Sequence, residues 1–179
     1  TASPDDGKTI TDHLLKKTEP TMKRLLLLLL LPALQTFAQP LQLDMDVFAQ
    51  RRAEFIRHLA PQSIAIFACK PEQIRNGDVA YEYRQESNFY YLSGFEEPES
   101  MLLLNPSAEK GKYIMFVRNR NRGAETWQGA RAGIDGAMAA FKADTALLFS
   151  DFRQVAPALL PKAGTLYYSF GINPRLDEM

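Results

Sequence analysis

The clearest pattern in the chain is a series of short apolar runs separated by polar stretches that contain glycine or proline. The run from Ser63 to Cys69 is almost continuously apolar, which is typical of a strand buried on both faces of a sheet. Runs from Met101 to Leu104 and from Tyr113 to Val117 flank a glycine-containing turn, so they are predicted to pair as a hairpin. Further strands are expected from Ala146 to Phe149 and from Thr165 to Phe170.

Three other segments have the apolar spacing of helices. The first is expected from Asp46 to about Leu59, with its first residue as the N-cap. The second is expected from Gly133 to Lys142. The third is expected from Asp151 to about Leu160, with Ser150 as its cap and a kink or an early end at Pro157. The inward residues are predicted to be Phe48, Phe55, Ile56 and Leu59 in the first helix, and Ile134, Met138 and Phe141 in the second.

The order of these elements predicts an α/β fold. The early strands pair locally and the later ones alternate with helices, so we expect a mixed β-sheet flanked by helices. Loops are expected from Lys70 to Gly77 and in the polar, glycine-punctuated stretch from Arg118 to Arg131. A chain of 179 residues has room for one ordinary domain.

The segment from Arg75 to Pro98 departs from this regular pattern, because aromatic residues surround a polar centre instead of alternating with it. Burying an unpaired polar side chain costs about 2–7 kcal/mol, so Arg84 and Gln85 are expected to be buried with hydrogen-bond partners. Phe89 to Leu92 is expected to be extended and to be followed by a turn at Gly94. The aromatic residues of the segment are Tyr81, Tyr83, Phe89, Tyr90, Tyr91 and Phe95.

The N-terminal residues have the layout of a secretory signal peptide. A charged start at Lys23 and Arg24, an apolar run from Leu25 to Leu34 and an A-x-A-like cleavage site before Gln39 predict a signal peptide over residues 22–38. The apolar run is shorter than the roughly 20 residues that span a membrane, so no anchor is expected after cleavage. Residues 1–21 are interpreted as a non-native or mis-assigned leader that is disordered, which leaves residues 39–179 as the domain. An exported protein, periplasmic or secreted, is expected.

The overall composition excludes several function classes. Lys and Arg total 21 and Asp and Glu total 21, so no global charge indicates nucleic acid or a membrane surface. Cys69 is the single cysteine, which rules out an intramolecular disulfide. Its apolar surroundings in sequence favour a buried small side chain over a reactive thiol.

The residues that usually carry catalysis are scarce. The two histidines are His13, in the leader, and His58, near a helix end, and no G-x-S-x-G motif accompanies them. Zinc sites normally use histidine and cysteine, so no metal site is predicted. Three nearby acids are interpreted as a solvated rim rather than a carboxylate metal site. These acids are Glu96, Glu97 and Glu99.

Two features of the stretch after Val117 could contact a partner. Arg118, Arg120 and Arg122 alternate, so on an extended strand they would share one face and could meet carboxylates. Trp127 is the only tryptophan and lies in a polar loop, where it is either part of a small core or an exposed binding residue. The residues alone therefore indicate a domain without its own catalytic centre.

The segment YEYRQESNFYYLSGFEEPES closely resembles the N-terminal domain of aminopeptidase P, the Xaa-Pro aminopeptidase of the creatinase/prolidase superfamily. The resemblance extends over about Asp46 to Phe170. Asn121 and Gln128 depart from it, at positions where an acid and an apolar residue occur. The structural motif that carries it is Tyr83, Arg84, Gln85, Phe89, Tyr91 and Gly94. Further matches are Gln50, Arg51, Arg52, Arg118, Arg120, Glu125, Trp127, Gly129, Arg131 and Gly133.

The resemblance implies a ribonuclease-H-like N-terminal domain beside a C-terminal pita-bread catalytic domain. That second domain binds two metal ions, usually manganese, through two Asp, one His and two Glu, none of which can be assigned here. The implied parent is a homo-oligomer that releases an N-terminal residue preceding proline from a peptide. Trp127 is then the substrate-binding residue, because in tetrameric relatives it reaches a neighbouring active site. The chain alone is expected to be inactive, with no catalytic or metal-binding residue.

Two alternatives remain open from the sequence. The parent could be a prolidase-type dipeptidase, which shares part of the Arg84 to Ser87 pattern, although Trp127 and its glycines favour aminopeptidase P. The chain could also be a non-catalytic peptide-binding or protein-binding module, as in peptidase-like domains of histone chaperones. Export argues against a role in chromatin.

Overall fold

The computed structural model describes residues 44–160 and 163–178, which belong to one unit, Leu43–Met179. The predicted leader and signal peptide lie outside the described residues. Within the described part of the chain, no helix is both long and apolar enough to cross a membrane.

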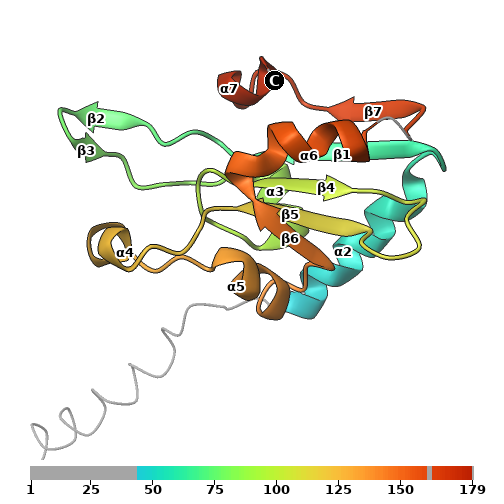
Figure 1. Cartoon of the computed structure of the whole chain (residues 1–179), viewed down its shortest axis with the longest axis horizontal. Helices are drawn as coiled ribbons and strands as arrows, with labels where there is room; N and C mark the ends of the chain where they lie inside the picture. Colours follow the sequence, from blue (N-terminus) through green and yellow to red (C-terminus); the bar gives the residue numbers. More distant parts are fainter. Residues whose placement is uncertain (1–43, 161–162, 179) are drawn as a thin grey trace, which may run out of the picture. The chain divides into compact units, whose positions relative to one another are not determined.

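A five-stranded mixed sheet forms the centre of this unit, with the strand order β6-β5-β4-β1-β7 (Figure 1). The antiparallel strands β1, β4 and β5 lie in the middle, and the parallel strands β7 and β6 flank them. The predicted mixed sheet and the predicted hairpin of β4 with β5 are therefore confirmed. The strands are β1 (Ser63–Ala68), β4 (Met101–Leu104), β5 (Tyr113–Val117), β6 (Thr145–Leu148) and β7 (Thr165–Tyr168).

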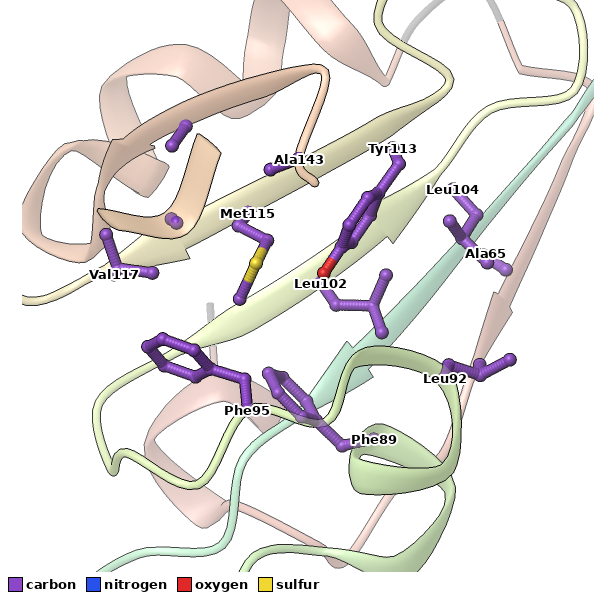
Figure 2. Packing of buried hydrophobic residues seen from close by; sticks show 12 residues of the cluster. Ala65, Phe89, Leu92, Phe95, Leu102, Leu104, Tyr113, Met115, Val117 and Ala143 are labelled. Atoms are coloured by element: carbon purple, nitrogen blue, oxygen red, sulfur yellow. The ribbon is translucent and has the colours of Figure 1, made fainter. Parts of the chain in front are cut away.

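One face of the sheet packs against three helices, α2 (Met45–His58), α3 (Ser87–Ser93) and α5 (Gly133–Ala139). Alternate residues of the central strands point to this side, because side chains alternate across a strand. Figure 2 shows Phe89 and Phe95 facing Leu102 and Met115 in this core. All four of these side chains are fully buried.

The opposite face packs against α6 (Phe152–Leu159) and the short α7 (Pro174–Asp177). Phe152 of α6 stacks edge-to-face on Phe116 of β5, with ring centroids 5.2 Å apart. The predicted cap at Ser150 is wrong, since a 3₁₀ turn (Phe149–Asp151) leads into α6 and no side chain caps it. The helix ends shortly after Pro157, as the sequence predicts.

The segment from Phe89 to Leu92 is helical, so the predicted extended conformation is wrong. Glu86 caps α3 by accepting a hydrogen bond from the Phe89 N–H at 2.8 Å. Gly94 ends the helix in the left-handed region, with φ of +67°. These two caps outweigh the strand preference of the aromatic residues between them.

Three further expectations need correction. The segment Lys70 to Gly77 is not all loop, because β2 (Ile74–Asn76) pairs with β3 (Val79–Ala80) in an exposed hairpin. The α2 cap is Asp44 rather than Asp46, and it accepts from the Asp46 N–H at 3.0 Å. In α5, Gly133 and Ala137 are buried while Ile134 and Met138 are exposed, so the predicted inward residues of this helix are wrong. A Cβ at Gly133 would lie 2.6 Å from the Arg120 side chain.

Candidate functional site: the Trp127 arm

Trp127 is 89% exposed. It belongs to a short helix that stands apart from the sheet (Figure 1). The helix is α4 (Arg122–Gln128), and it has no buried residue. We call residues 118–132 the Trp127 arm. The sequence predicted a loop here, because the polar and small residues around the single tryptophan give no apolar periodicity. Trp127 is therefore exposed and not part of a small core, and its role as a binding residue stays a prediction.

The arm obtains its helical turn from local hydrogen bonds rather than from burial. The Asn121 side chain accepts from the N–H groups of Gly123 and Ala124 at 3.0 and 3.2 Å. The Glu125 carboxylate in turn accepts a hydrogen bond from the Asn121 N–H at 3.2 Å. It also forms an ion pair with Arg120 at 3.5 Å. Asn121 thus replaces the acid of the family pattern with another good N-cap.

Arg131, near the C-terminal end of the arm, stabilises it by bonding to residues on both sides of α4. Arg131 donates to the Gln128 side chain at 2.6 Å and to the Asn119 carbonyl at 3.3 Å. The helix ends at Gly129, whose φ of +82° is accessible mainly to glycine. Gln128 is the second departure from the family pattern, and its side chain therefore stabilises the arm by accepting this hydrogen bond from Arg131.

Glu97 fixes the base of the arm from both sides. One carboxylate oxygen lies 3.3 Å from the guanidinium of Arg118, where the arm begins. The other accepts from the Ala132 N–H at 2.7 Å, where the arm ends. The side chains of Arg118 and Glu97 are only 10% and 18% exposed, so water screens this ion pair weakly.

The position of Glu97 corrects two sequence interpretations. Glu96 and Glu99 are exposed, but Glu97 is not part of a solvated rim. The alternating arginines likewise do not share a partner, since Arg118 pairs with Glu97 and Arg120 pairs with Glu125. The sequence could not separate these roles, because they depend on where α5 meets the end of β5.

Gln85 is the centre of a buried hydrogen-bond network, as predicted. The side chain is 3% exposed, and its amide donates to the Glu97 carbonyl at 3.2 Å and to Ser100 at 3.4 Å. Its oxygen accepts from the N–H groups of Glu86 and Lys70 at 2.9 and 3.4 Å. Every polar atom of this side chain therefore has a partner.

The other residues of the predicted motif divide into supporting and exposed positions. The Tyr83 hydroxyl lies 3.0 Å from the Gln85 oxygen, and burial raises the pKa of Tyr83. Tyr91 is exposed and covered by the guanidinium of Arg51 at 4.3 Å. Arg84 is exposed and donates to the Ser87 hydroxyl at 3.3 Å, so its predicted burial is wrong.

A buried arginine lies on α2, and the sequence named it as a family match without predicting its burial. Arg52 is 4% exposed, donates to the Leu92 carbonyl at 2.8 Å and covers the Tyr113 ring at 3.9 Å. Burial lowers the pKa of Arg52, and the nearby Tyr113 and Asp144 oppose that effect. The family match to Gln50, Arg51 and Arg52 was the signal that could have identified it.

The remaining candidates for chemistry do not form a centre among the described residues. No group of three or more His, Cys, Asp or Glu in residues 44–160 and 163–178 could hold a metal ion. His58 is exposed at the end of α2, where it contacts Glu54. Cys69 is buried, and desolvation raises the pKa of its thiol.

A model of the family "Aminopeptidase P, N-terminal domain" matches residues 48–168. The Xaa-Pro aminopeptidases of Haemophilus influenzae and Escherichia coli are 34% and 35% identical over 127 and 131 residues, which are 71% and 73% of this chain. This chain spans 30% of each of those two proteins.

Among solved structures, Pseudomonas aeruginosa aminopeptidase PepP is 39% identical with a TM-score of 0.74. The match covers 78% of this chain and 31% of that one. The matching fold and the family model agree with the motif in residues 75–98 and with the Trp127 arm. The chain therefore belongs to the family of aminopeptidase P N-terminal domains.

Proposed function

We propose that this chain is the substrate-restricting and oligomerisation domain of a manganese-dependent Xaa-Pro aminopeptidase. The full-length enzyme would release an N-terminal residue that precedes proline. The observation that carries the proposal is the exposure of Trp127 on an arm whose base is fixed. The Xaa-Pro aminopeptidase names of the relatives support the reaction class.

Trp127 has the properties of a contact residue for a site that this domain does not itself form. A large exposed indole gains energy when a partner covers it, and tryptophan is enriched among the residues that dominate binding. The Glu97 contacts at both ends of the arm limit how far the indole can move. We therefore propose that Trp127 bounds the substrate pocket of a neighbouring subunit and contacts the proline-containing peptide.

Catalysis is proposed to lie in a C-terminal domain of the parent. The described residues do not fit a manganese site, because no group of suitable side chains converges among them. When bound in that second domain, two metal ions would supply an activated water. This chain would contribute the wall that admits a free N-terminus and excludes other polypeptide.

The test compares two variants of the full-length gene product with the wild type. Trp127→Ala should lower kcat/KM for an Xaa-Pro peptide by about tenfold or more, as expected for the loss of a dominant contact. Thr126→Ala is the matched control. Thr126 is adjacent to Trp127, and its hydroxyl donates to the Arg122 carbonyl within α4. Unchanged kinetics and unchanged oligomeric state in Trp127→Ala would contradict the proposed role.

Two further measurements separate the alternatives. Residues 39–179 with added manganese should not cleave an Xaa-Pro peptide, and measurable cleavage would place catalysis in this domain. If the full-length protein cleaves Xaa-Pro dipeptides but does not cleave peptides that are longer, the parent is a prolidase. If it cleaves neither, the chain is a binding module.

We also propose that the protein is exported and processed before Gln39. The support is the charged, apolar and small-residue order of residues 22–38. N-terminal sequencing of protein from the extracellular or periplasmic fraction should begin at Gln39. Recovery of unprocessed protein only from the cytoplasmic fraction would refute export.

A further inference from the structure

A pocket lies at the carboxyl ends of two neighbouring parallel strands. Strands β5 and β6 are adjacent at one edge of the sheet (Figure 1), and their last residues, Val117 and Leu148, are paired in register. The pocket beside these strand ends has a volume of about 380 Å³. In α/β sheets, ligands bind preferentially outside the carboxyl ends of the strands. The ionised and apolar side chains that line it are Glu99, Arg118, Arg131, Val117, Leu148 and Phe149.

Only one of the two arginines in this pocket has an acidic partner among the described residues. Arg118 forms an ion pair with Glu97 at 3.3 Å. The described contacts of Arg131 are with neutral groups, namely the Gln128 side chain and the Asn119 carbonyl. The positive charge of Arg131 is therefore available to an anionic group.

Both arginines also carry a donor that lacks an acceptor. The Nε atoms of Arg118 and Arg131 are buried and have no hydrogen-bond partner among the described residues. The side chain of Arg118 is only 10% exposed, so bulk water cannot readily replace the missing acceptor. Buried donors are nearly always paired in native proteins, so two unpaired donors beside one pocket point to a bound acceptor. An oxyanion in the pocket would draw both guanidinium groups toward it and supply these acceptors.

Glu99 brings a negative charge to the same pocket from a strained backbone position. Its φ is +49°, a region that residues other than glycine seldom occupy. Such strain persists only where the surrounding structure holds it, and it is concentrated at ligand-binding and active sites. The Glu99 side chain lines the pocket and is exposed, so its carboxylate can meet a ligand.

We propose that this pocket binds a small zwitterion, namely a free amino acid or a dipeptide. The ligand carboxylate would pair with Arg118 and Arg131, and the ligand ammonium group would pair with Glu99. The charges of the two arginines are balanced by those of Glu97 and Glu99, so a ligand without net charge complements the pocket better than an anion does.

The size and the walls of the pocket favour this class of ligand over inorganic phosphate. Ligand pockets usually measure about 300–1,000 Å³, so this one suits a ligand at the small end of that range. Val117, Leu148 and Phe149 would contact an apolar side chain, which phosphate lacks. Glu99 would also repel a phosphate dianion, whereas it attracts the ammonium group of an amino acid.

The inference goes beyond the proposed function, because binding in this pocket needs neither a metal ion nor a second domain. Amino acids and short peptides belong to the chemical class that the proposed reaction would consume and release. Arg118 and Arg131 also support the Trp127 arm, so the ligand would contact the side chains that hold that arm. Binding to the 179-residue chain is measured without any assay of cleavage, so failure of this inference and failure of the proposed function give separate results.

An NMR titration of the isotope-labelled 179-residue chain tests the inference. The probes are leucine and the dipeptide Ala-Leu. At least one of them should shift the amide signals of Arg118, Asn119, Phe149 and Ser150, with a Kd of about 1 mM or tighter. The amide of the tighter probe lacks the carboxylate, and its N-acetyl form lacks the ammonium group. Each of these analogues, and inorganic phosphate, should bind at least about tenfold more weakly than the probe.

Substitutions separate this pocket from other sites on the chain. Glu99→Gln should weaken binding about tenfold and should also remove the difference between the probe and its N-acetyl form, which a purely structural defect would not do. Glu96→Gln is the matched control, because Glu96 is a nearby exposed acid that does not line the pocket. Ser150→Phe should abolish binding by filling part of the pocket, and the Ser150 hydroxyl itself donates to Asp151 rather than to the arm.

Each result either supports or overturns the inference. Shifts in the pocket amides that are lost in Ser150→Phe, weakened in Glu99→Gln and kept in Glu96→Gln support it. The inference is overturned if neither probe shifts these amides, if the amide or N-acetyl analogue binds as tightly as the probe, or if Glu99→Gln binds like the wild type. Phosphate that binds as tightly as either probe would identify a simple oxyanion site and would also overturn it.

Discussion

Replacing Gln85 by methionine should lower the free energy of unfolding, whereas the same replacement of its neighbour Arg84 should leave it nearly unchanged. The two residues are adjacent and polar, and methionine preserves much of the length of either side chain. Gln85 is buried with a partner for every polar atom, whereas Arg84 is exposed and donates to the Ser87 hydroxyl at 3.3 Å. The comparison therefore tests burial and hydrogen bonding at nearly constant side-chain size.

The magnitude follows from the groups that Gln85→Met would leave unpaired. The N–H groups of Lys70 and Glu86 lose their acceptor, while Ser100 keeps its 2.7 Å hydrogen bond to the Glu97 carbonyl. An unsatisfied buried donor costs about 1–3 kcal/mol. Because both N–H groups are only partly buried, we expect a total loss of about 2–3 kcal/mol. Exposed substitutions without special contacts change stability by less than about 0.5 kcal/mol, which is the expectation for Arg84→Met.

Urea unfolding followed by circular dichroism measures both free energies of unfolding. Gln85→Met should lower the midpoint without changing the m-value, as expected for a change in native-state stability alone. Arg84→Met should superimpose on the wild type. If Arg84→Met loses as much stability as Gln85→Met, or if neither loses any, the network does not stabilise the fold as described.

Two other substitutions test the elements that position the arm and α3. Gly94→Ala places a methyl group 2.8 Å from the Phe48 ring at φ of +67°, so it should cost about 2–4 kcal/mol in urea unfolding. Gly77→Ala is the control that separates conformation from contact, because its φ is +54° and nothing lies within 4 Å. Glu97→Gln leaves the charge of Arg118 uncompensated and should cost about 2–4 kcal/mol while speeding amide exchange in residues 118–132. Unchanged amide exchange in residues 118–132 would contradict the conclusion that Glu97 fixes the base of the arm.

The central strands were predictable because each is a continuous run of apolar residues, which is typical of a strand that is buried on both faces. The runs from Met101 to Leu104 and from Tyr113 to Val117 are apolar at every position, and both are buried on two faces. The helix α3 was not predicted, because its aromatic residues favour strands and the decision depends on two caps, Glu86 and Gly94. Helix α4 was missed for a related reason, since Asn121 and Glu125 stabilise it without an apolar face.

The exposure of Trp127 agrees with the sequence-based hypothesis, but the contacts that support its arm could not be predicted. The single Trp127 in a polar stretch was already a candidate contact residue, and its exposure agrees with that interpretation. Which polar residue is buried cannot be deduced from adjacency, as the contrast between Arg84 and Gln85 demonstrates. The role of Glu97 depends on contacts to residues that are 21 and 35 positions away, which no local pattern encodes.

These long-range contacts connect the aromatic motif to the arm through one residue. The backbone carbonyl of Glu97 accepts from Gln85, and its carboxylate holds Arg118 and the Ala132 N–H. Because the buried network fixes the backbone at Glu97, it also fixes the point from which the carboxylate reaches the arm. The motif in residues 75–98 is therefore more than packing, since the rigid position of its last turn determines where the arm that carries Trp127 begins and ends.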